Sequence, residues 1–432
     1  MTILRTKAQE AVVAIFQETL RQVTGDTLVR SFCWREDDRL YIGGSEYDLA
    51  AYRRIVLLGA GKASCSMAVG FCEAIGDFPI EGLIVTKYGH GSHDDLAGHG
   101  DIELLEAGHP IPDANSLLAG AKMLELAAST TDSDLVVVLI SGGASSLMEA
   151  PAPGIELADL QFVTEALLRS GAPIEDVNGV RVSLSRIKAG GLARACGGEV
   201  VCLLLSDVLG NPREYIGSGP CWGAPPPPSK ALDILSRRGI DAPASVHGWL
   251  AQTHVEAAVH PEHFVVGDVY TLLEAAQVAA ESLGFKPRVY GRTFSGEARE
   301  VGARMAAEAL SLGQEDGKVD CIVAAGETTV TVRGPGRGGR SQELACAAAI
   351  ALADTPDIAL LAAGTDGTDG PTDAAGGIVD GQTHKRANLR HALDANDSYP
   401  VLEAADALLV TGPTQTNLND IVIVVRVPED LA

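Results

Sequence analysis

The stretch IVLLGAGKAS, residues 55–64, runs from four apolar residues into a turn that holds two glycines and a lysine. A short apolar run before a glycine turn is typical of a buried strand that ends at the turn. We therefore predict a strand at 54–58 and a helix at 62–75. A strand, a loop and a helix in this order are the repeating unit of α/β folds.

The same alternation continues through most of the chain. Further strands are predicted at 82–86, 135–140, 199–205, 263–267, 320–325, 358–362 and 421–426. Further helices are predicted at 5–22, 115–129, 157–170, 230–238, 270–283, 296–311 and 340–353. This order indicates an α/β fold with largely parallel sheets flanked by helices, and the last strand fits either sheet.

A proline run divides the chain. The segment GAPPPPSK, residues 223–230, cannot continue a helix or a central strand, and it stiffens the backbone into an extended spacer. The 432 residues are enough for two domains that each bury a core. We place the boundary here, which predicts α/β domains at 1–225 and 226–432.

The balance of charge restricts the partners. The chain has 57 acidic and 33 basic residues, a formal net charge of −24. Nucleic acids and anionic membranes need a basic surface, so neither is an expected partner. A small anionic substrate stays compatible, because a few local cations can override the overall field.

The cysteines and the N-terminus predict a cytoplasmic protein. The eight cysteines form no CxxC pair and no zinc spacing, which favours buried reduced thiols in a reducing compartment. The first residues, MTILRTKAQEAVVAIF, are amphipathic and lack the apolar core of a signal peptide. No apolar stretch is long enough to cross a bilayer.

Two glycine loops in the first half are candidate anion sites. Gly59, Gly61, Lys62 and Ser64 follow the first strand, and they match neither the P-loop nor the full dinucleotide fingerprint. The loop 141–146, Ser-Gly-Gly-Ala-Ser-Ser, follows a second strand and offers N–H and hydroxyl donors. A solvated lysine and a capped turn without a ligand remain the alternatives. The candidate phosphate-binding residues of this second loop are Ser141, Gly142, Gly143 and Ser145.

Three further loops carry carboxylates or arginines. Asp207 directly follows the strand at 199–205 and could hold Mg²⁺ through oxygen or cap a turn. Glu327 follows the strand at 320–325, and Gly338, Gly339 and Arg340 open a helix in a glycine-rich loop. Two arginines in this loop suit a polyanion, although a solvated charged loop would look alike.

The last such loop is GTDGTDGPTD, residues 364–373, with Asp366 as its first carboxylate. It lacks the terminal glutamate and the flanking helices of an EF-hand, so Mg²⁺ or ribose binding and a plain Asx turn are the alternatives. Several candidate anion-binding loops, together with carboxylates that could hold Mg²⁺, favour phosphoryl transfer as the reaction. Hydride transfer is less well supported, because Glu81 precedes the strand that the ribose-binding acid should follow.

Taken together, eight motifs resemble those of the glycerate 2-kinase family, the type with a MOFRL C-terminal domain. They are LLGAGKAS, EAGHPIPDANS, LISGGASSLMEAP, LSRIKAGGLA, LLLSDVLGNPREYIGSGP, GETTVTVRGPGRGGRSQELA, AAGTDGTDGPTDAAGGIVD and TGPTQTNLNDI, in family order from about residue 55 to 421. The chain departs from the family pattern at a few positions, among them Val182, Ala189, Ser341 and Gln415. Ala189 and Gln415 stand where the family motifs have glycine.

The resemblance implies a Rossmann-like N-terminal domain and a MOFRL-type C-terminal domain with the active site in the cleft between them. It implies Mg²⁺-dependent transfer of phosphate from ATP to the 2-hydroxyl of D-glycerate, giving 2-phosphoglycerate and ADP. Lys62 and Arg340 match the family's catalytic lysine and arginine, and Asp207 matches an aspartate expected to hold Mg²⁺ or substrate.

From the residues and this resemblance we assign hypothetical roles. Lys62 neutralises the transferred phosphoryl group, Arg340 holds the substrate carboxylate, and Asp207 is the candidate base. Ser64 is a further candidate substrate contact, and Asp207, Glu327 and Asp366 are the candidate Mg²⁺ ligands. The nucleotide-binding glycines are Gly59, Gly61, Gly142, Gly143, Gly338 and Gly339.

Two other functions remain open at this stage. One is an NAD(P)H-dependent hydroxypyruvate reductase that uses the first glycine turn, and the other is a nucleotide-binding sensor without turnover. The expected assembly is a monomer or a homodimer.

Overall fold

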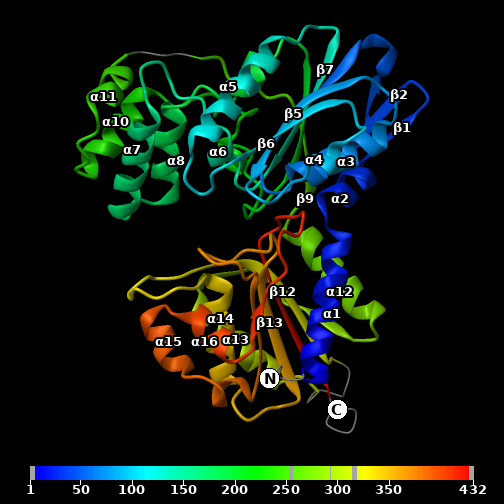
Figure 1. Cartoon of the computed structure of the whole chain (residues 1–432), viewed down its shortest axis with the longest axis vertical. Coiled ribbons are helices and arrows are strands. Elements are labelled where there is room, and N and C mark those ends of the chain that lie inside the picture. The colour runs from blue at the N-terminus through cyan, green and yellow to red at the C-terminus, as the bar shows by residue number, and fades with distance from the viewer. Residues whose placement is uncertain (1–4, 253–255, 292, 314–318, 428–432) are drawn as a thin grey trace. The chain divides into compact units, whose positions relative to one another are not determined.

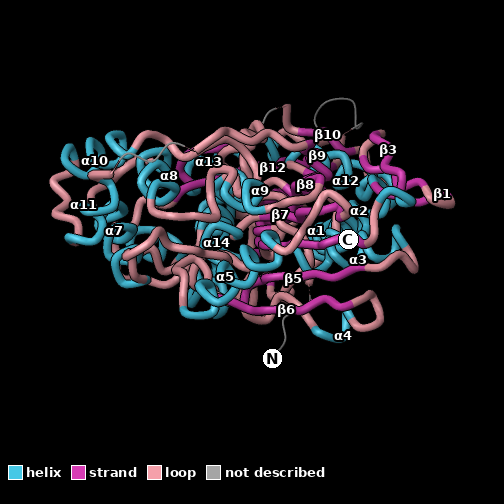
Figure 2. Tube along the Cα trace, turned by 90° about the horizontal axis from the view of Figure 1, so that it is seen from above, coloured by secondary structure: helices cyan, strands magenta, loops and turns pink. Residues whose placement is uncertain are grey.

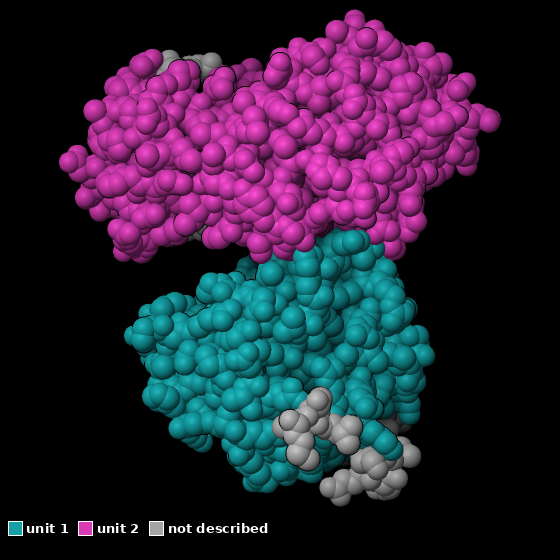
Figure 3. All heavy atoms as spheres, in the orientation of Figure 1, with its two compact units in different colours: residues 1–24, 267–432 teal, residues 25–266 magenta. Residues whose placement is uncertain are grey.

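The computed structural model describes residues 5–252, 256–291, 293–313 and 319–427. The chain forms two compact units, which Figure 3 distinguishes by colour. Unit 2 consists of residues 25–266, and unit 1 combines residues 267–432 with the segment that ends at residue 24. Each unit contains one large sheet and helices, as the α/β prediction requires.

The units divide about forty residues later than the proline run. Helix α10 (Pro228–Arg237) and α11 (Ala244–Leu250) share a hydrophobic core with α7 (Leu157–Arg169) and α8 (Ile174–Ser183) of unit 2. Strand β9 (Glu262–Gly267) is hydrogen-bonded to the edge of the unit 2 sheet. The proline segment therefore connects two parts of unit 2, because the apolar faces beyond it are buried there.

Unit 2 is built on a six-stranded sheet in the order β6-β5-β4-β7-β8-β9, and Figure 2 labels β6, β5, β7, β8 and β9 in this sequence. Its strand pairs β6–β5, β5–β4, β4–β7 and β7–β8 are parallel. The first five strands in chain order are β4 (Arg54–Ala60), β5 (Ile80–Lys87), β6 (Asp101–Ala107), β7 (Asp134–Ser141) and β8 (Glu199–Leu205). Strand β7 is buried along its whole length, which is why it reads as a continuous apolar run.

Helices and a small sheet complete unit 2. The helices are α2 (Gly25–Phe32), α3 (Ser64–Ile75), α4 (His93–Leu96), α5 (Ala114–Ala128), α6 (Ala144–Leu147), α7 (Leu157–Arg169), α8 (Ile174–Ser183) and α9 (Gly191–Ala195), with α10 and α11. The small antiparallel sheet consists of β1 (Cys33–Glu36), β2 (Arg39–Ile42) and β3 (Ser45–Asp48). The predicted helices and strands of this unit are confirmed to within about two residues, whereas the small sheet, β6 and the helices α2, α4, α6, α8, α9 and α11 had no predicted counterpart.

Unit 1 contains a seven-stranded sheet that is mixed, so the prediction of a largely parallel second sheet is wrong. Strand β12 (Cys321–Thr329) is parallel to β10 (Pro287–Val289) and to β11 (Phe294–Glu297). The remaining strands are β13 (Ile358–Gly364), β14 (Gly376–Asp380), β15 (Leu408–Leu409) and β16 (Asp420–Arg426), and their pairs are antiparallel.

The reason for this error lies in the last strand. β16 inserts between β12 and β13 and runs antiparallel to both. A strand buried on both faces is apolar whichever way it runs, so its composition does not reveal its direction. The insertion also assigns the last strand, which fitted either predicted sheet, to unit 1.

Helices cover both faces of the unit 1 sheet. Figure 1 shows α1 (Lys7–Gln22) and α12 (Val269–Ser282) on one side of β12 and β13, and α13 to α16 on the other. The helices of the second group are α13 (Ala298–Leu310), α14 (Arg340–Ala351), α15 (Leu389–Ala395) and α16 (Ser398–Ala404). Thr6 caps α1 through a capping box with Gln9, which fixes where this helix begins.

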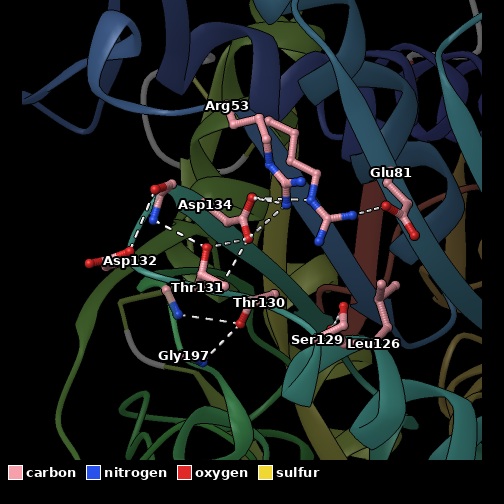
Figure 4. Close-up of polar contacts among 12 residues, drawn as sticks. Arg53, Glu81, Leu126, Ser129, Thr130, Thr131, Asp132, Asp134 and Gly197 are labelled. Carbon is pink, nitrogen blue, oxygen red and sulfur yellow. Dashed lines mark hydrogen bonds and ion pairs between the residues drawn. The ribbon is translucent and has the colours of Figure 1, made fainter.

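The amino-terminal ends of the unit 2 strands are tied together by a charged network (Figure 4). The Asp134 carboxylate, at the start of β7, accepts hydrogen bonds from Arg53 and Arg54 and from the N–H of Thr131 at 2.9 Å. Arg54 also pairs with Glu81 at the start of β5. Because ligands bind at the opposite, carboxyl ends of such strands, this network has a structural role.

We expect Asp134→Asn to lower the free energy of unfolding at pH 7 by about 2–3 kcal/mol, because it removes a fully buried charge that two arginines face. Burial alone would raise the pKa of Asp134, but the Thr131 N–H, Arg54 and Arg53 hold it below its usual value. The stabilisation by Asp134 is therefore present at pH values above the pKa of this carboxyl in the unfolded chain, about 4. It is lost as the pH falls through the lower pKa that the carboxyl has in the folded protein. Urea unfolding at pH 7 and below pH 4 checks this, with the exposed Asp132→Asn as the control. An equal loss at both pH values would contradict it.

Two residues that replace a family glycine adopt the left-handed backbone that glycine favours. Ala189 has φ = 47° and Gln415 has φ = 63°. A side chain in this region costs about 1 kcal/mol or more. We expect Ala189→Gly and Gln415→Gly each to raise the free energy of unfolding by about 0.5–1 kcal/mol.

Thermal unfolding checks this second prediction. Ala351→Gly, at an exposed position in the last turn of α14, is the matched control and should destabilise the protein. A loss of stability in all three variants would show that the left-handed backbone is not the source of strain.

Candidate functional site

The first two predicted loops are locked together in unit 2. Gly61 has φ = 135°, and a β-carbon there would lie 2.1 Å from Oγ of Ser141, so only glycine fits. The Ser141 hydroxyl accepts from the N–H of Ala63 at 3.0 Å, and the N–H of Lys62 donates to the carbonyl of Gly142 at 3.0 Å. β4 and β7 are neighbouring parallel strands, and their carboxyl ends bring the two loops into contact.

Lys62 and His109 both lie against the second loop. A β-carbon at Gly143, where φ = 92°, would lie 3.1 Å from Cδ2 of His109 and 3.5 Å from Cγ of Lys62. His109 follows β6, which is separated from β7 by β5 and β4 in the sheet order. His109 was not predicted as a site residue, because β6, the strand before it, was not predicted either; its place in the motif EAGHPIPDANS was the signal that could have found it.

Two predicted residues of the first loop have structural contacts. The Ser64 hydroxyl is fully buried and is within hydrogen-bonding distance of two carbonyls, 2.8 Å from that of Gly61 and 2.9 Å from that of Val85. Gly59 lies inside β4, and a β-carbon there would lie 2.6 Å from Ile84. Both residues shape the loop that presents Lys62.

A charged cluster lies beside the 141–146 loop. Lys188 and Glu149 form an ion pair, and each residue is only 2% exposed. Arg181, in the last turn of α8, donates to the carbonyl of Ser145 at 3.1 Å. Burial lowers the pKa of Lys188 and of Arg181, and Glu149 partly offsets this for each. None of these three residues was a sequence-based candidate.

Asp207 follows β8, the neighbour of β7 in the same sheet. Ser141 and Leu205 are register partners, so Asp207 lies just beyond the strand end beside the second loop. Its side chain is half-buried. Unit 2 thus gathers Gly61, Lys62 and the loop 141–146 at one edge, with Asp207 following the next strand.

In unit 1, Arg340 is the centre of a carboxylate cluster. Its Nε and Nη2 donate to the two oxygens of Asp420, at 2.6 and 2.9 Å, and its Nη1 donates to Glu327 at 2.6 Å. Arg340 begins α14, Glu327 lies in β12, and Asp420 begins β16. Burial lowers the pKa of Arg340, but Asp420 and Glu327 raise it far above its usual value in total.

Asp369 caps the start of α14. Its two oxygens accept from the N–H groups of Ser341 at 3.2 Å and Gln342 at 2.8 Å. Burial and the nearby Asp420 raise the pKa of Asp369 to about 7, against the lowering effect of those N–H groups. Burial likewise raises the pKa of Asp420 to about 6, although Arg340 lowers it.

The predicted glycines of this loop allow close packing. A β-carbon at Gly339 would lie 2.2 Å from Cγ of Asp369, and one at Gly338 would lie 2.0 Å from Oγ of Ser398. Both glycines therefore have a packing reason to be present, whether or not a phosphate binds near them. Asp369, Asp420 and Ser398 were not predicted as site residues, and the fold brings them to Arg340 and its loop from later segments.

The predicted metal ligands divide between the units. Asp366 and Asp420 lie near one another, since their Oδ1 atoms would be 3.3 and 3.6 Å from a β-carbon on Gly364. Glu327 reaches Asp420 through Arg340, whereas Asp207 belongs to unit 2. Within the described ranges, no group of three or more His, Cys, Asp or Glu side chains has an arrangement that could hold a metal ion.

Comparison with known families defines the class of protein. The model described as "Domain of unknown function (DUF4147)" matches residues 11–251, and that of the MOFRL family matches residues 320–420. The first match alone covers more than half of the chain. This combination, with the motifs above, shows that the chain belongs to the glycerate 2-kinase family that has a MOFRL domain.

Individual relatives agree with this family. A D-glycerate 2-kinase of Thermotoga maritima is 42% identical over 86% of this chain and 90% of its own length. A crystal structure of a glycerate kinase from the same organism has a TM-score of 0.81 and 38% identity, over 97% of this chain and 99% of that one. A protein of Agrobacterium vitis named "Putative hydroxypyruvate reductase" is 41% identical over 85% of this chain and 86% of its own length.

Proposed function

We propose that this kinase transfers the γ-phosphoryl group of ATP to the 2-hydroxyl of D-glycerate, giving 2-phosphoglycerate and ADP. The observation that carries the proposal is the locked pair of glycine loops in unit 2. The backbone contacts of Ala63 with Ser141 and of Lys62 with Gly142 fix the start of the Lys62 side chain beside the 141–146 loop. A fixed cation beside a loop rich in N–H donors suits a transferring phosphoryl group.

Lys62 then neutralises charge on the equatorial oxygens of the phosphoryl group as the bond to the leaving oxygen breaks. Asp207, beyond the neighbouring strand, is the proposed acceptor of the proton from the substrate hydroxyl. Arg340 has five N–H donors, of which Asp420 and Glu327 take three. Its remaining donors are proposed to bind the substrate carboxylate.

The proposal includes Mg²⁺, and all contacts described above are made between protein atoms alone. When bound, it would neutralise the phosphates of ATP. Mg²⁺ in kinases is held by one or two carboxylates together with substrate phosphates, so the neighbouring pair Asp366 and Asp420 fits this donor set. Asp207 and Glu327 remain further candidates.

The structure offers little to a nicotinamide cofactor. In dinucleotide-binding folds an acidic residue at the end of the second strand binds the ribose. Here β5 ends in Thr86 and Lys87, and Glu81 lies at the other end of this strand in a pair with Arg54. A reductase therefore lacks its ribose-binding acid at this position.

Two parallel assays separate the kinase from the reductase. ADP formation from ATP should require D-glycerate, and hydroxypyruvate should not consume NADH or NADPH. Nicotinamide consumption without glycerate-dependent ADP formation would overturn the proposal, and nucleotide binding without either reaction would favour the sensor.

We also propose a cytoplasmic location. All eight cysteines are free thiols, and seven of them are buried, in keeping with a reducing compartment. In the part of the chain that the structure describes, no helix has the length and apolarity to span a bilayer. Whether the chain is a monomer or a homodimer stays a prediction.

A further inference from the structure

Three charged side chains beside the 141–146 loop have no role in the function proposed above. Glu149 and Lys188 are almost fully buried, and Arg181 is half-buried at the end of α8. Burying three charged groups costs free energy unless they are paired and hydrogen-bonded. The hydrogen bonds of each side chain therefore indicate its role.

Both carboxylate oxygens of Glu149 have donors other than Arg181. Its Oε2 accepts from Lys188, and its Oε1 accepts from the Ser185 hydroxyl at 2.6 Å and from the N–H of Ala150 at 3.1 Å. Lys188 and Glu149 therefore neutralise each other. With two cations and one carboxylate, the cluster keeps one positive charge, and it resides on Arg181.

Arg181 also keeps most of its donors. A guanidinium has five N–H groups, and among the described residues Arg181 donates one hydrogen bond, to the carbonyl of Ser145. The backbone N–H groups of Gly143, Ala144 and Ser145, in the loop that Arg181 contacts, likewise donate no hydrogen bond within the described part of the chain. A contact to one carbonyl needs no charge, whereas a half-buried guanidinium with open donors suits a carboxylate or phosphate.

We propose that Arg181 is an anion-binding residue, which holds a carboxylate or phosphate group of a substrate against the 141–146 loop. Lys188 and Glu149 are positioning residues: their pair, with Ser185, fixes the segment around residue 149 that follows the loop. The binding of an anion stands on the geometry alone, and its identity as the glycerate carboxylate or an ATP phosphate rests on the proposed function.

The test is calorimetric titration of the full-length protein with three separate probes: inorganic phosphate, D-glycerate, and ATP with Mg²⁺. Arg181→Gln should weaken binding of at least one probe by roughly 10- to 100-fold, the usual loss for a charge-assisted contact. Arg181→Lys keeps the charge without the planar fork and should lie between Arg181→Gln and the wild type. A loss confined to D-glycerate assigns the carboxylate, whereas a loss for ATP assigns a phosphate.

Arg186→Gln is the matched control, since Arg186 lies nearby, is exposed and donates to the carbonyl of Pro151. It should bind all three probes as the wild type does. The proposal is overturned if folded Arg181→Gln binds every probe within twofold of wild type, if Arg186→Gln loses as much, or if the wild type binds none. Should Arg181→Gln fail to fold, the same criteria apply to Arg181→Lys.

These titrations need no turnover, so the two proposals can fail separately. Wild-type protein that binds these anions through Arg181 but does not phosphorylate D-glycerate would contradict the proposed function alone. An active kinase whose Arg181→Gln variant binds normally would contradict the anion-binding role alone.

Discussion

Lys62→Met should lower kcat for D-glycerate phosphorylation by roughly 10²- to 10³-fold, the usual loss when one fixed donor to a transition-state charge is removed. The methionine keeps most of the stem and removes the ammonium. The variant should still fold, because it keeps the backbone contacts of Lys62 and Ala63 that hold the loop. Steady-state kinetics together with thermal unfolding measure both effects.

The matched control for this variant is Lys122→Met. Lys122 is a partly exposed lysine of α5 that pairs with Glu103, away from the loops at the carboxyl ends of β4 and β7. It should retain full kcat. If Lys62→Met turned over at the wild-type rate, Lys62 would have no part in the chemistry.

Arg340→Ala should be inactive and should also destabilise unit 1 by about 3 kcal/mol at pH 7. Removing the guanidinium leaves Asp420, which is nearly buried, without its two hydrogen bonds and without a compensating charge. Glu327 is partly exposed, so its loss adds little. Urea unfolding of the wild type and the variant gives the difference in the free energy of unfolding.

The pH dependence of this loss identifies its cause. Burial raises the pKa of Asp369 to about 7 and that of Asp420 to about 6, so the folded state binds these protons more tightly than the unfolded state. Stability contributed by these groups therefore increases as the pH falls from 7 towards 5. Without Arg340 the pKa of Asp420 rises further, and the difference between variant and wild type should shrink at pH 5. A difference that stays constant or grows would contradict an electrostatic origin.

Activity needs a separate control, because an unstable variant is inactive for a trivial reason. Arg337→Ala removes a second arginine of the same loop. The Arg337 guanidinium stacks on the ring of Tyr399 and lies outside the Asp420 cluster. It should keep the stability of unit 1 to within about 1 kcal/mol. Arg340→Lys keeps the charge and loses the bidentate fork, so a raised KM for D-glycerate with modest destabilisation is expected.

The sequence was sufficient for the elements that have a strong periodic signal. The runs at 54–58 and 135–140 became β4 and β7, and the glycine loops after them meet as expected for the carboxyl ends of neighbouring parallel strands. These predictions depend on local sequence patterns and on the rule that the carboxyl ends of parallel strands lie at the same edge of a sheet. Neither depends on contacts between distant segments.

Other features depend on contacts between distant segments. β14 was not predicted, because it begins with Gly376 and Gly377, which are typical of a loop. These residues form a strand through their pairing with β13 and β15. Asp420 meets Arg340 only because β16 inserts next to β12. A single sequence does not carry such pairings.

The partner of a charge is equally hard to read from the sequence. Lys188 and Glu149 are 39 residues apart, and nothing in the two motifs that contain them indicates that they pair. Glu81, by contrast, was set aside as a ribose-binding acid because of its position before a strand. The structure places it in the network of Arg54 and Asp134, at the end of the sheet opposite the glycine loops.

Production of 2-phosphoglycerate is the most direct measurement of the proposed function. Purified protein would be mixed with D-glycerate, ATP and Mg²⁺ and coupled to enolase, with no phosphoglycerate mutase present. Enolase accepts only the 2-phosphate, so formation of phosphoenolpyruvate at a rate that depends on D-glycerate is the predicted result. ADP release without phosphoenolpyruvate would contradict phosphorylation at the 2-hydroxyl, and no ADP release would contradict the kinase itself.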